Sequence, residues 1–266
     1  MLNLTVMPAA EAFNFGEVSI SWYGVVIALA VLSGFIIALR LAKKKNLDQD
    51  HIYNLLVILT VVGVFGGRLV YVLIEWGYYR NNLIDLIKIW QGGLSIFGVI
   101  LGALISLILY SHRKKISFFS LSDIVIVAAP LMQAIGRWGN FFNQELYGLP
   151  TGLPWGIFID TEHRLPEYAG QEFYHPLFFY ESILMLVLFI FLYFFSVRRR
   201  LKPGQLTLLY LLFFSVIRFS LDFIRLDKPS WGFLSVAQWV CLGVFIVAVF
   251  VWRRYKKGDS SQTLSK

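Results

Sequence analysis

The sequence predicts an all-α fold, a polytopic transmembrane helix bundle of about seven spans. Of the 266 residues, 58% are hydrophobic and only 15% are charged, whereas a soluble domain carries about 25% charged residues. The apolar residues also gather in long runs, and roughly 17–25 such residues cross the hydrocarbon core of a bilayer. We expect one membrane-embedded domain at residues 1–258 and a disordered cytoplasmic tail at residues 259–266.

Seven apolar runs are long enough to be membrane spans. The fourth is the weakest, because Asp123, Pro130 and Arg137 interrupt it. A polar, turn-rich segment at about residues 139–174 separates the fourth span from the fifth and predicts a small extracytoplasmic head. The expected spans are Trp22–Leu39, Ile52–Ile74, Leu94–Tyr110, Leu121–Trp138, Pro176–Val197, Leu206–Ile224 and Phe233–Trp252.

The Lys and Arg residues are distributed unevenly between the loops. Sixteen of the 24 follow the odd-numbered spans, in clusters that begin at Arg40, Arg113, Arg198 and Arg253. Cytoplasmic loops are the ones rich in Lys and Arg, so we expect the N-terminus outside and the C-terminus in the cytoplasm. The net charge of +8 is then a topology signal, and we expect no nucleic acid partner.

Three arginines, Arg68, Arg137 and Arg218, lie inside apolar spans. A charge at this depth is energetically expensive and usually marks a functional site. Each lies in the last third of a span that runs from inside to outside, and Tyr23 and Gln238, near the starts of spans one and seven, reach the same depth. The sequence therefore predicts a polar site at the level of the outer headgroups.

Two of these arginines belong to charged patterns with helical spacing. Arg218, Asp222 and Arg225 share one helix face, where Asp222 can neutralise a neighbour. They could form part of a site, or an ion-pair ladder that only joins helices. Arg68 follows the glycines of Gly63–Gly67, a pattern more typical of close helix packing.

The densest polar stretch is Gly136–Gly148. The Arg137 guanidinium can hold a phosphodiester through two parallel hydrogen bonds, and Asn140 and Asn143 can hold neighbouring oxygens. Glu145 can orient the guanidinium or accept a proton, and Gly148 allows close backbone approach. A plain alternative is a polar helix end capped by asparagine.

Two further residues carry weaker signals. His175 precedes Pro176 at the start of the fifth span and is more typical of an interfacial anchor than of a base. Cys241 is the only cysteine, so it cannot form an internal disulfide and offers no paired-cysteine metal spacing. We expect no metal and no cofactor.

The stretch Gly136–Gly148 resembles the signature motif of the bacterial prolipoprotein diacylglyceryl transferases. Shorter segments agree with that family in the same order along the chain, from about Trp22 to Trp239. The resemblance implies transfer of the diacylglyceryl group of phosphatidylglycerol to the lipobox cysteine thiol of secreted prolipoproteins. The product is a thioether and glycerol 1-phosphate leaves, the first step of bacterial lipoprotein maturation. These segments are Trp22–Gly24, Gly67–Leu73, Gly92–Ser95, His175–Pro176, Tyr180–Glu181, Arg218–Arg225 and Ser235 with Gln238–Trp239.

The resemblance also implies residue roles, partners and a location. The partners would be phosphatidylglycerol, secreted prolipoproteins and membrane lipids, at the bacterial inner (cytoplasmic) membrane with the active site towards the outer leaflet. The expected catalytic residues are Arg137, Arg218, Glu145 and Tyr23. The expected lipid-binding residues are Arg137, Asn140, Asn143, Gly148, Arg68, Asp222, Arg225, His175 and Gln238.

Three positions depart from the family pattern. Phe97 stands where members commonly have His or Tyr, Phe214 where a Tyr is often found, and Asp222 in place of a Glu. Phenylalanine cannot move a proton, so the general base stays unassigned. A membrane transporter and a non-catalytic lipid-binding paralogue remain as alternatives, and a phosphatidylglycerol-dependent thiol assay separates the enzyme from both.

Overall fold

The computed structural model describes residues 11–15, 18–89, 92–199 and 201–263, and its contacts divide into two compact units. Unit 1 comprises Met1–Ile36 and Val125–Lys266, and unit 2 comprises Ile37–Ile124. The predicted single domain at residues 1–258 stays a prediction.

Eight α-helices lie in the described residues, six of them long and apolar enough to cross a membrane. The protein is therefore a multi-pass, all-α membrane protein, as predicted. The orientation of its termini stays a prediction. The helices are α1 (Trp22–Lys44), α2 (Gln49–Ile74), α3 (Trp76–Tyr79), α4 (Ile96–Lys114), α5 (Phe118–Phe142), α6 (Leu177–Arg198), α7 (Gln205–Leu221) and α8 (Val236–Thr263).

The structure differs from the predicted spans in three places. Helix α5 runs unbroken through Pro130, because membrane helices tolerate a proline whose freed carbonyl finds other partners. Helix α7 has only 17 residues and ends at Leu221, three residues early, because the Phe223 and Ile224 amides donate to carbonyls three residues back and close a turn.

The third difference is at the C-terminus. The backbone of α8 is helical to Thr263, beyond the predicted end of the seventh span at Trp252. The predicted disorder of residues 259–266 stays a prediction, and residues 264–266 lie outside the described residues. A helix already formed extends at little cost, because each added residue contributes one hydrogen bond.

Three short antiparallel strand pairs, none of them predicted, lie outside the helices. They are too short for an alternating sequence pattern to reveal them. The pairs are β1 (Glu11–Phe15) with β2 (Val18–Ser21), β3 (Ile157–Phe158) with β4 (Phe173–Tyr174), and β5 (Ser230–Trp231) with β6 (Leu234–Ser235).

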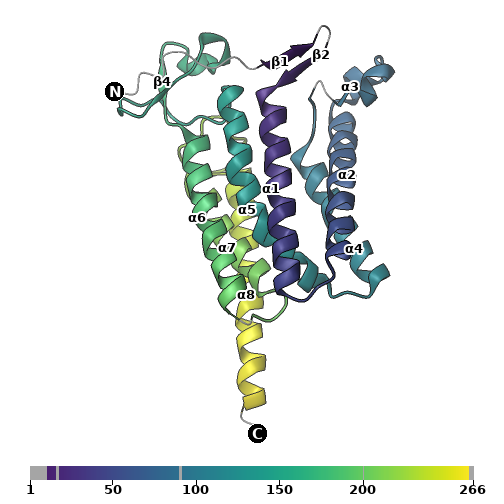
Figure 1. Cartoon of the computed structure of the whole chain (residues 1–266). Coiled ribbons are helices and arrows are strands. Elements are labelled where there is room, and N and C mark those ends of the chain that lie inside the picture. Colours follow the sequence, from purple (N-terminus) through teal and green to yellow (C-terminus); the bar gives the residue numbers. More distant parts are fainter. Residues whose placement is uncertain (1–10, 16–17, 90–91, 200, 264–266) are drawn as a thin grey trace. The chain divides into compact units, whose positions relative to one another are not determined.

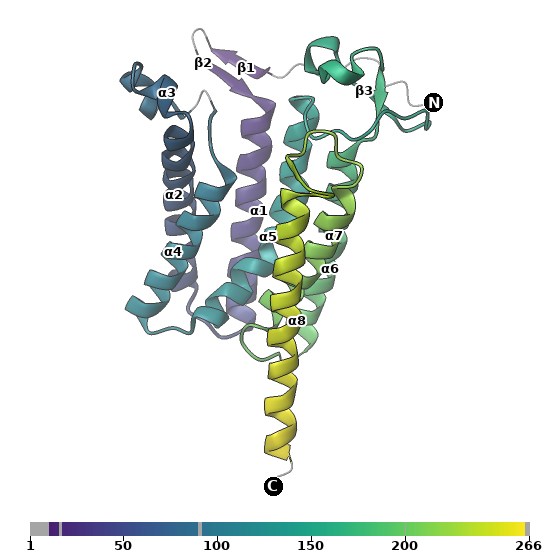
Figure 2. The same cartoon turned by 180° about the vertical axis from the view of Figure 1, so that it is seen from behind.

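Two of the loops of unit 1 lie together at one end of its helices. Helices α6, α7 and α8 run side by side (Figure 1), and the segments that join α5 to α6 and α7 to α8 lie together at the end of these helices where α8 begins (Figure 2). Residues 143–176 fold there around a small core of Tyr147, Ile157, Ile159, Tyr174 and Phe178. We call this segment the head; its position outside the cytoplasm stays a prediction.

Unit 2 is organised by the packing of α2 against α4. A Cβ added at Gly98 would lie 2.2 Å from the Gly66 carbonyl oxygen, and one at Gly102 would lie 2.7 Å from the Val62 carbonyl oxygen. The two backbones therefore touch directly, as small residues allow in membrane helices. This contact accounts for the glycines of Gly63–Gly67.

Candidate functional site

The centre of the site is a buried carboxylate between two guanidiniums. Glu181 on α6 has a side chain only 1% exposed, and its Oε1 lies 2.6 Å from Nη2 of Arg137 on α5. Its Oε2 lies 3.7 Å from Nη1 of Arg218 on α7, which is an ion pair but too long for a hydrogen bond. Glu181 therefore holds the two predicted arginines together from a third helix.

Asp222 forms the second buried carboxylate of the cluster. Its Oδ1 lies 3.2 Å from Nη2 of Arg218, and its side chain is fully buried. The Ser235 hydroxyl donates to its Oδ2. The predicted pairing of Arg218 with Asp222 is therefore present in the structure.

Gln238 acts on Asp222 indirectly, through Ser235. Ser235 precedes α8, its Oγ accepts from the Gln238 amide at 3.0 Å, and Gln238 Oε1 accepts from the Ser235 amide at 2.9 Å. This reciprocal pair is a capping box. It directs the Ser235 hydroxyl at Asp222, so Gln238 acts through the cap, and its lipid contact stays a prediction.

The cluster leaves buried polar atoms without hydrogen-bond partners among the described residues. Such atoms are rare and cost about 1–3 kcal/mol each. All of them come from the cluster and its immediate neighbours. They are Arg137 Nε, Glu181 Oε2, Arg218 Nη1, Asp222 Oδ1, Arg225 Nε and Gln133 Oε1.

Arg225 adds a third cation. It lies beyond the end of α7, so it does not share the helix face of Arg218 and Asp222 as we expected, because the helix stops at Leu221. It instead bridges the backbone of Gly148 in the head. Burial, and after it the nearby Arg218 charge, lowers the pKa of Arg225, while the carboxylates of Asp222, Asp227 and Glu181 oppose this shift. With Arg137, Arg218, Glu181 and Asp222, the cluster carries one excess positive charge.

Gly148 lies between two segments of backbone, one at Ile224 and one at His175. A Cβ there would lie 2.8 Å from the Ile224 carbonyl oxygen and 3.1 Å from His175 Cβ. Its amide donates to the His175 carbonyl at 2.8 Å. Glycine at this position thus lets the head close onto the segment that carries Arg225.

The residues after α5 form a network around Glu145. Glu145 Oε1 accepts from the side-chain amides of Asn140 at 2.8 Å and Asn143 at 3.4 Å. Asn140 Oδ1 lies 3.5 Å from Nη1 of Arg137. Glu145 is therefore linked to Arg137 through Asn140 and is exposed to solvent, so the direct orienting group of Arg137 is Glu181.

The segment holding Glu145 has a strained backbone. Gln144 has φ +50° and Leu146 has φ +56°, values that non-glycine residues seldom adopt. The Gln144 side chain is fixed by Asp160, whose amide donates to Gln144 Oε1 at 2.7 Å. Strain of this kind persists where the surroundings fix it and is common at functional sites.

Tyr23 lies beside this segment. A Cβ added at Gly139 would lie 2.7 Å from Tyr23 Cδ2, so the ring packs directly on the α5 backbone. The preceding Trp22 stacks on Phe142 with ring centroids 5.4 Å apart. The start of α1 is thereby attached to the polar end of α5, within reach of the predicted site.

His175 contacts an aromatic side chain. Its Nδ1 lies 3.1 Å from the Tyr180 hydroxyl, which accepts from Trp155 Nε1 at 2.8 Å. These contacts tie the head to the start of α6, and the role of His175 as an interfacial anchor stays a prediction. A lipid contact of His175 stays a prediction.

Arg68 belongs to unit 2 and has different surroundings. Its Nε donates to the Leu86 carbonyl at 3.0 Å, and Nη1 donates to the carbonyls of Gly92 and Gly93 at 2.7 and 3.1 Å. Its Nη2 donates to the carbonyls of Asp85 and Lys88. All five N–H groups of the guanidinium are thus used by backbone oxygens, and we leave Arg68 out of the site proposed below.

Two of the three departures from the family pattern are aromatic. Phe97 is 76% exposed on α4 in unit 2. Phe214 stacks on Tyr210 with ring centroids 5.3 Å apart, and the Tyr210 hydroxyl accepts from Gln133 Nε2 at 2.8 Å. A tyrosine hydroxyl therefore occurs one turn before Phe214, beside the cluster.

Sequence reasoning omitted Glu181 from the predicted site. It is the one acidic residue in the span predicted at Pro176–Val197, and a carboxylate in an apolar span needs a cationic partner. That requirement could have paired it with Arg137 or Arg218. Ser235 was also missed, although the Ser-x-x-Gln spacing of a capping box is visible in the sequence.

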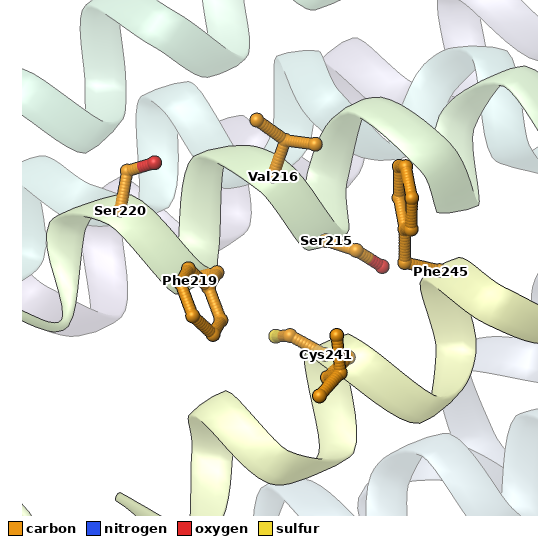
Figure 3. A pocket seen from close by; sticks show the side chains of 7 residues that line it. Ser215, Val216, Phe219, Ser220, Cys241 and Phe245 are labelled. Carbon is orange, nitrogen blue, oxygen red and sulfur yellow. The ribbon is translucent and has the colours of Figure 1, made fainter. Parts of the chain in front are cut away.

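An apolar pocket of about 160 Å³ lies between α7 and α8. Phe219 from α7 and Cys241 from α8 point into the space between the two helices (Figure 3). Ser215 and Phe245 also line it. Helix α7 thus carries both Arg218 of the net-positive cluster and one wall of an apolar pocket, an arrangement suited to an amphiphile with one anionic group.

The chain matches known proteins along almost its whole length. A family model described as prolipoprotein diacylglyceryl transferase matches residues 10–254. A phosphatidylglycerol–prolipoprotein diacylglyceryl transferase of Thermosynechococcus vestitus is 37% identical over 247 residues, which is 92% of this chain and 92% of that protein. That of Synechococcus elongatus is 39% identical over 252 residues, covering 92% and 87%. That of Finegoldia magna is 38% identical over 246 residues, covering 92% and 95%.

Proposed function

The chain belongs to the prolipoprotein diacylglyceryl transferase family, and from that premise we propose that its arginine cluster binds and activates phosphatidylglycerol. The resemblance noted in the sequence is confirmed. The protein is a membrane-embedded transferase that moves the diacylglyceryl group of phosphatidylglycerol to a prolipoprotein, the first step of lipoprotein maturation. We take the acceptor to be the thiol of the lipobox cysteine.

The observation that carries the proposal is the excess charge of the cluster. Arg137, Arg218 and Arg225 face two buried carboxylates, and a buried nitrogen of each guanidinium makes no hydrogen bond to the described residues. A phosphodiester brings one negative charge and oxygens that accept such hydrogen bonds. Its binding would compensate both the charge and the unpaired donors.

The reaction then follows from the chemistry of the two substrates. The thiolate sulfur attacks the glycerol carbon bonded to the phosphate oxygen, the C–S bond forms and the C–O bond breaks. The bonding pair passes to the phosphate oxygen, so glycerol 1-phosphate leaves with more negative charge than the diester carried. Fixed donors aimed at developing charge are each worth about 3–4 kcal/mol, which is the role we assign to Arg137 and Arg218.

A proton must leave the thiol, whose pKa is near 8.5 in water. Glu145 is an exposed carboxylate that is linked to Arg137 through Asn140, and it is held by Asn140 and Asn143. We assign it the acceptor role, with Tyr23 packed alongside. Phe97 cannot take that role because its side chain does not titrate.

The lipid tails would lie against the apolar helices. The pocket beside Phe219 and Cys241 would take part of one acyl chain, which enters laterally from the bilayer. The bias of Lys and Arg supports an N-terminus outside and a C-terminus in the cytoplasm of a bacterial inner membrane. The cluster would then face the outer leaflet.

Transfer measured with purified protein tests the proposal. The wild type in detergent, given phosphatidylglycerol and a lipobox peptide, should yield a thioether-linked diacylglyceryl peptide seen as a mass increase. The same peptide with serine in place of cysteine should stay unmodified. A folded wild type that binds the lipid without modifying the cysteine peptide would support the non-catalytic paralogue instead, and lipid or solute flux without modification would support a transporter.

A further inference from the structure

A second cavity, which is polar, lies between the head and Arg225 of the arginine cluster. It has a volume of about 270 Å³ and is bounded by the start of the head at residues 143–147, by His163 and Leu165 further along the head, and by the segment after α7. A single water needs about 10–15 Å³ of such space, so a three-carbon polyol fits. Its polar lining groups include Asn143, Glu145, His163, Arg225 and Asp227.

The walls of this cavity are held in place. The Tyr147 hydroxyl donates to the His163 carbonyl at 2.6 Å and accepts from the Leu165 amide at 3.1 Å. Gln144 is bound to Asp160. The cavity is therefore formed by the folded head and needs little rearrangement to receive a ligand.

The lining offers both hydrogen-bond acceptors and donors. The carboxylates of Glu145 and Asp227 only accept, the Arg225 guanidinium only donates, and the Asn143 amide does both. A hydroxyl group also does both, so a vicinal diol can donate to the carboxylates and accept from Arg225 or Asn143. An ammonium group can donate but cannot accept, and it would leave the Arg225 donors unpaired.

The charge of the cavity lining also favours a neutral polyol. Arg225 is already counted with the cluster, so Glu145 and Asp227 bring two negative charges to the cavity, and these disfavour a second anionic group there. The cavity also joins the cluster, because Glu145 is bonded to Asn140 beside Arg137 and Arg225 follows Asp222 by three residues. A phosphate on the cluster would place its outer substituent here.

We propose that this cavity is a diol-recognition site for the terminal glycerol of the lipid headgroup, with Asp227 as its specificity-determining residue. This inference rests on the proposed function. The terminal glycerol departs with the phosphate, so the site would hold the leaving group while the acyl-bearing glycerol passes to sulfur. The donor lipid would then be selected by its hydroxyl groups as well as its charge.

The test compares donor lipids that differ only in the headgroup. Initial transfer rates are measured for phosphatidylglycerol and for phosphatidylpropanol, which keeps the charge and loses both hydroxyls. The wild type should prefer phosphatidylglycerol by at least tenfold. Asp227→Asn should reduce this preference several-fold, and Asn143→Ala should do so to a smaller degree. Because each ratio comes from one preparation, the amount of folded protein cancels.

Glu167→Gln is the matched control, since Glu167 is an exposed head carboxylate outside the cavity, and its ratio should equal that of the wild type. Equal rates from the two lipids in the wild type would overturn the inference, as would wild-type ratios in both cavity variants. Neither result touches the proposed function. The proposed function would fail only if the wild type transferred nothing from phosphatidylglycerol.

Discussion

Arg68 in unit 2 and the pair Arg137 and Arg218 in unit 1 look alike in the sequence but are treated differently by the fold. Each is a cation within an apolar helix. Arg68 gives all five of its N–H groups to backbone carbonyls, whereas Arg137 and Arg218 each have a buried nitrogen that makes no hydrogen bond to the described residues. A guanidinium whose N–H groups are all hydrogen-bonded within the protein stabilises its own loop. One that keeps N–H groups without a hydrogen bond can still bind a ligand.

The difference lies in what surrounds each arginine. Gly92 and Gly93 adopt positive φ of 88° and 77° and thereby turn their carbonyls toward Arg68. Arg137 and Arg218 both meet Glu181 from α6, and Arg218 also meets Asp222 at the end of its own helix; these carboxylates balance charge without using every donor. Burial alone therefore does not mark a catalytic arginine.

The largest effect is expected from Glu181→Gln. The amide keeps the shape but loses the charge that holds Arg137 and Arg218, and breaking a buried ion pair costs about 3–5 kcal/mol. We predict at least a 100-fold loss of transfer rate per folded protein, measured with a lipobox peptide in detergent. Glu167→Gln should keep the wild-type rate. A transfer rate of the Glu181→Gln protein within about threefold of the wild-type rate would contradict the role of Glu181 in holding the two arginines.

The next effect concerns stability and belongs to unit 2. Gly98→Ala places a Cβ against the Gly66 carbonyl, and overpacking of this kind costs about 1–3 kcal/mol. We predict a lower unfolding temperature in detergent. Gly243→Ala on α8, where a Cβ meets nothing within 4 Å, is the control and should unfold like wild type. Equal unfolding temperatures for the two variants would contradict the close α2–α4 contact.

Phe97→His should have a smaller effect. Phe97 is exposed in unit 2, and the wild type is expected to act without a titratable group there. We predict a rate within a few-fold of wild type and a modest change in its pH profile. An inactive wild type that gains activity from Phe97→His would indicate a decayed paralogue.

The smallest effect is expected from Cys241→Ala. The acceptor thiol belongs to the prolipoprotein, so the buried Cys241 forms no covalent intermediate. The rate should stay within about twofold of wild type, with any change arising from the pocket it lines. Loss of all transfer in a folded Cys241→Ala protein would require a different mechanism.

The sequence was sufficient for the helix bundle and for most of the cluster. Long apolar runs identify the spans, and charges such as Arg137 and Arg218 stand out within them. Sequence spacing did not reveal that α7 ends at Leu221, which separates Arg225 from its expected face and brings it to Gly148. The end of α7 depends on backbone bonds to the distant head, such as Leu149 to Ile224.

The roles within the polar motif were harder to assign from sequence. Glu145 is near Arg137 in sequence, whereas Glu181 is 44 residues away and makes the direct contact. Helical periodicity orders residues on one helix and says little about which helix lies opposite. The hydrogen bonds from Arg68 to the backbone carbonyls of residues 85, 86, 88, 92 and 93 could not be predicted either, because backbone acceptors have no sequence signature.

The comparison of Arg137→Lys with Arg68→Lys tests the central claim most directly. Lysine keeps the charge but loses the planar fork and two donors. Transfer to a lipobox peptide is measured per folded protein, alongside the unfolding temperature. We predict that Arg137→Lys loses most of its transfer rate with nearly unchanged stability, and that Arg68→Lys unfolds earlier but transfers at close to the wild-type rate. The reverse pattern, or near-full rates in both, would contradict the account.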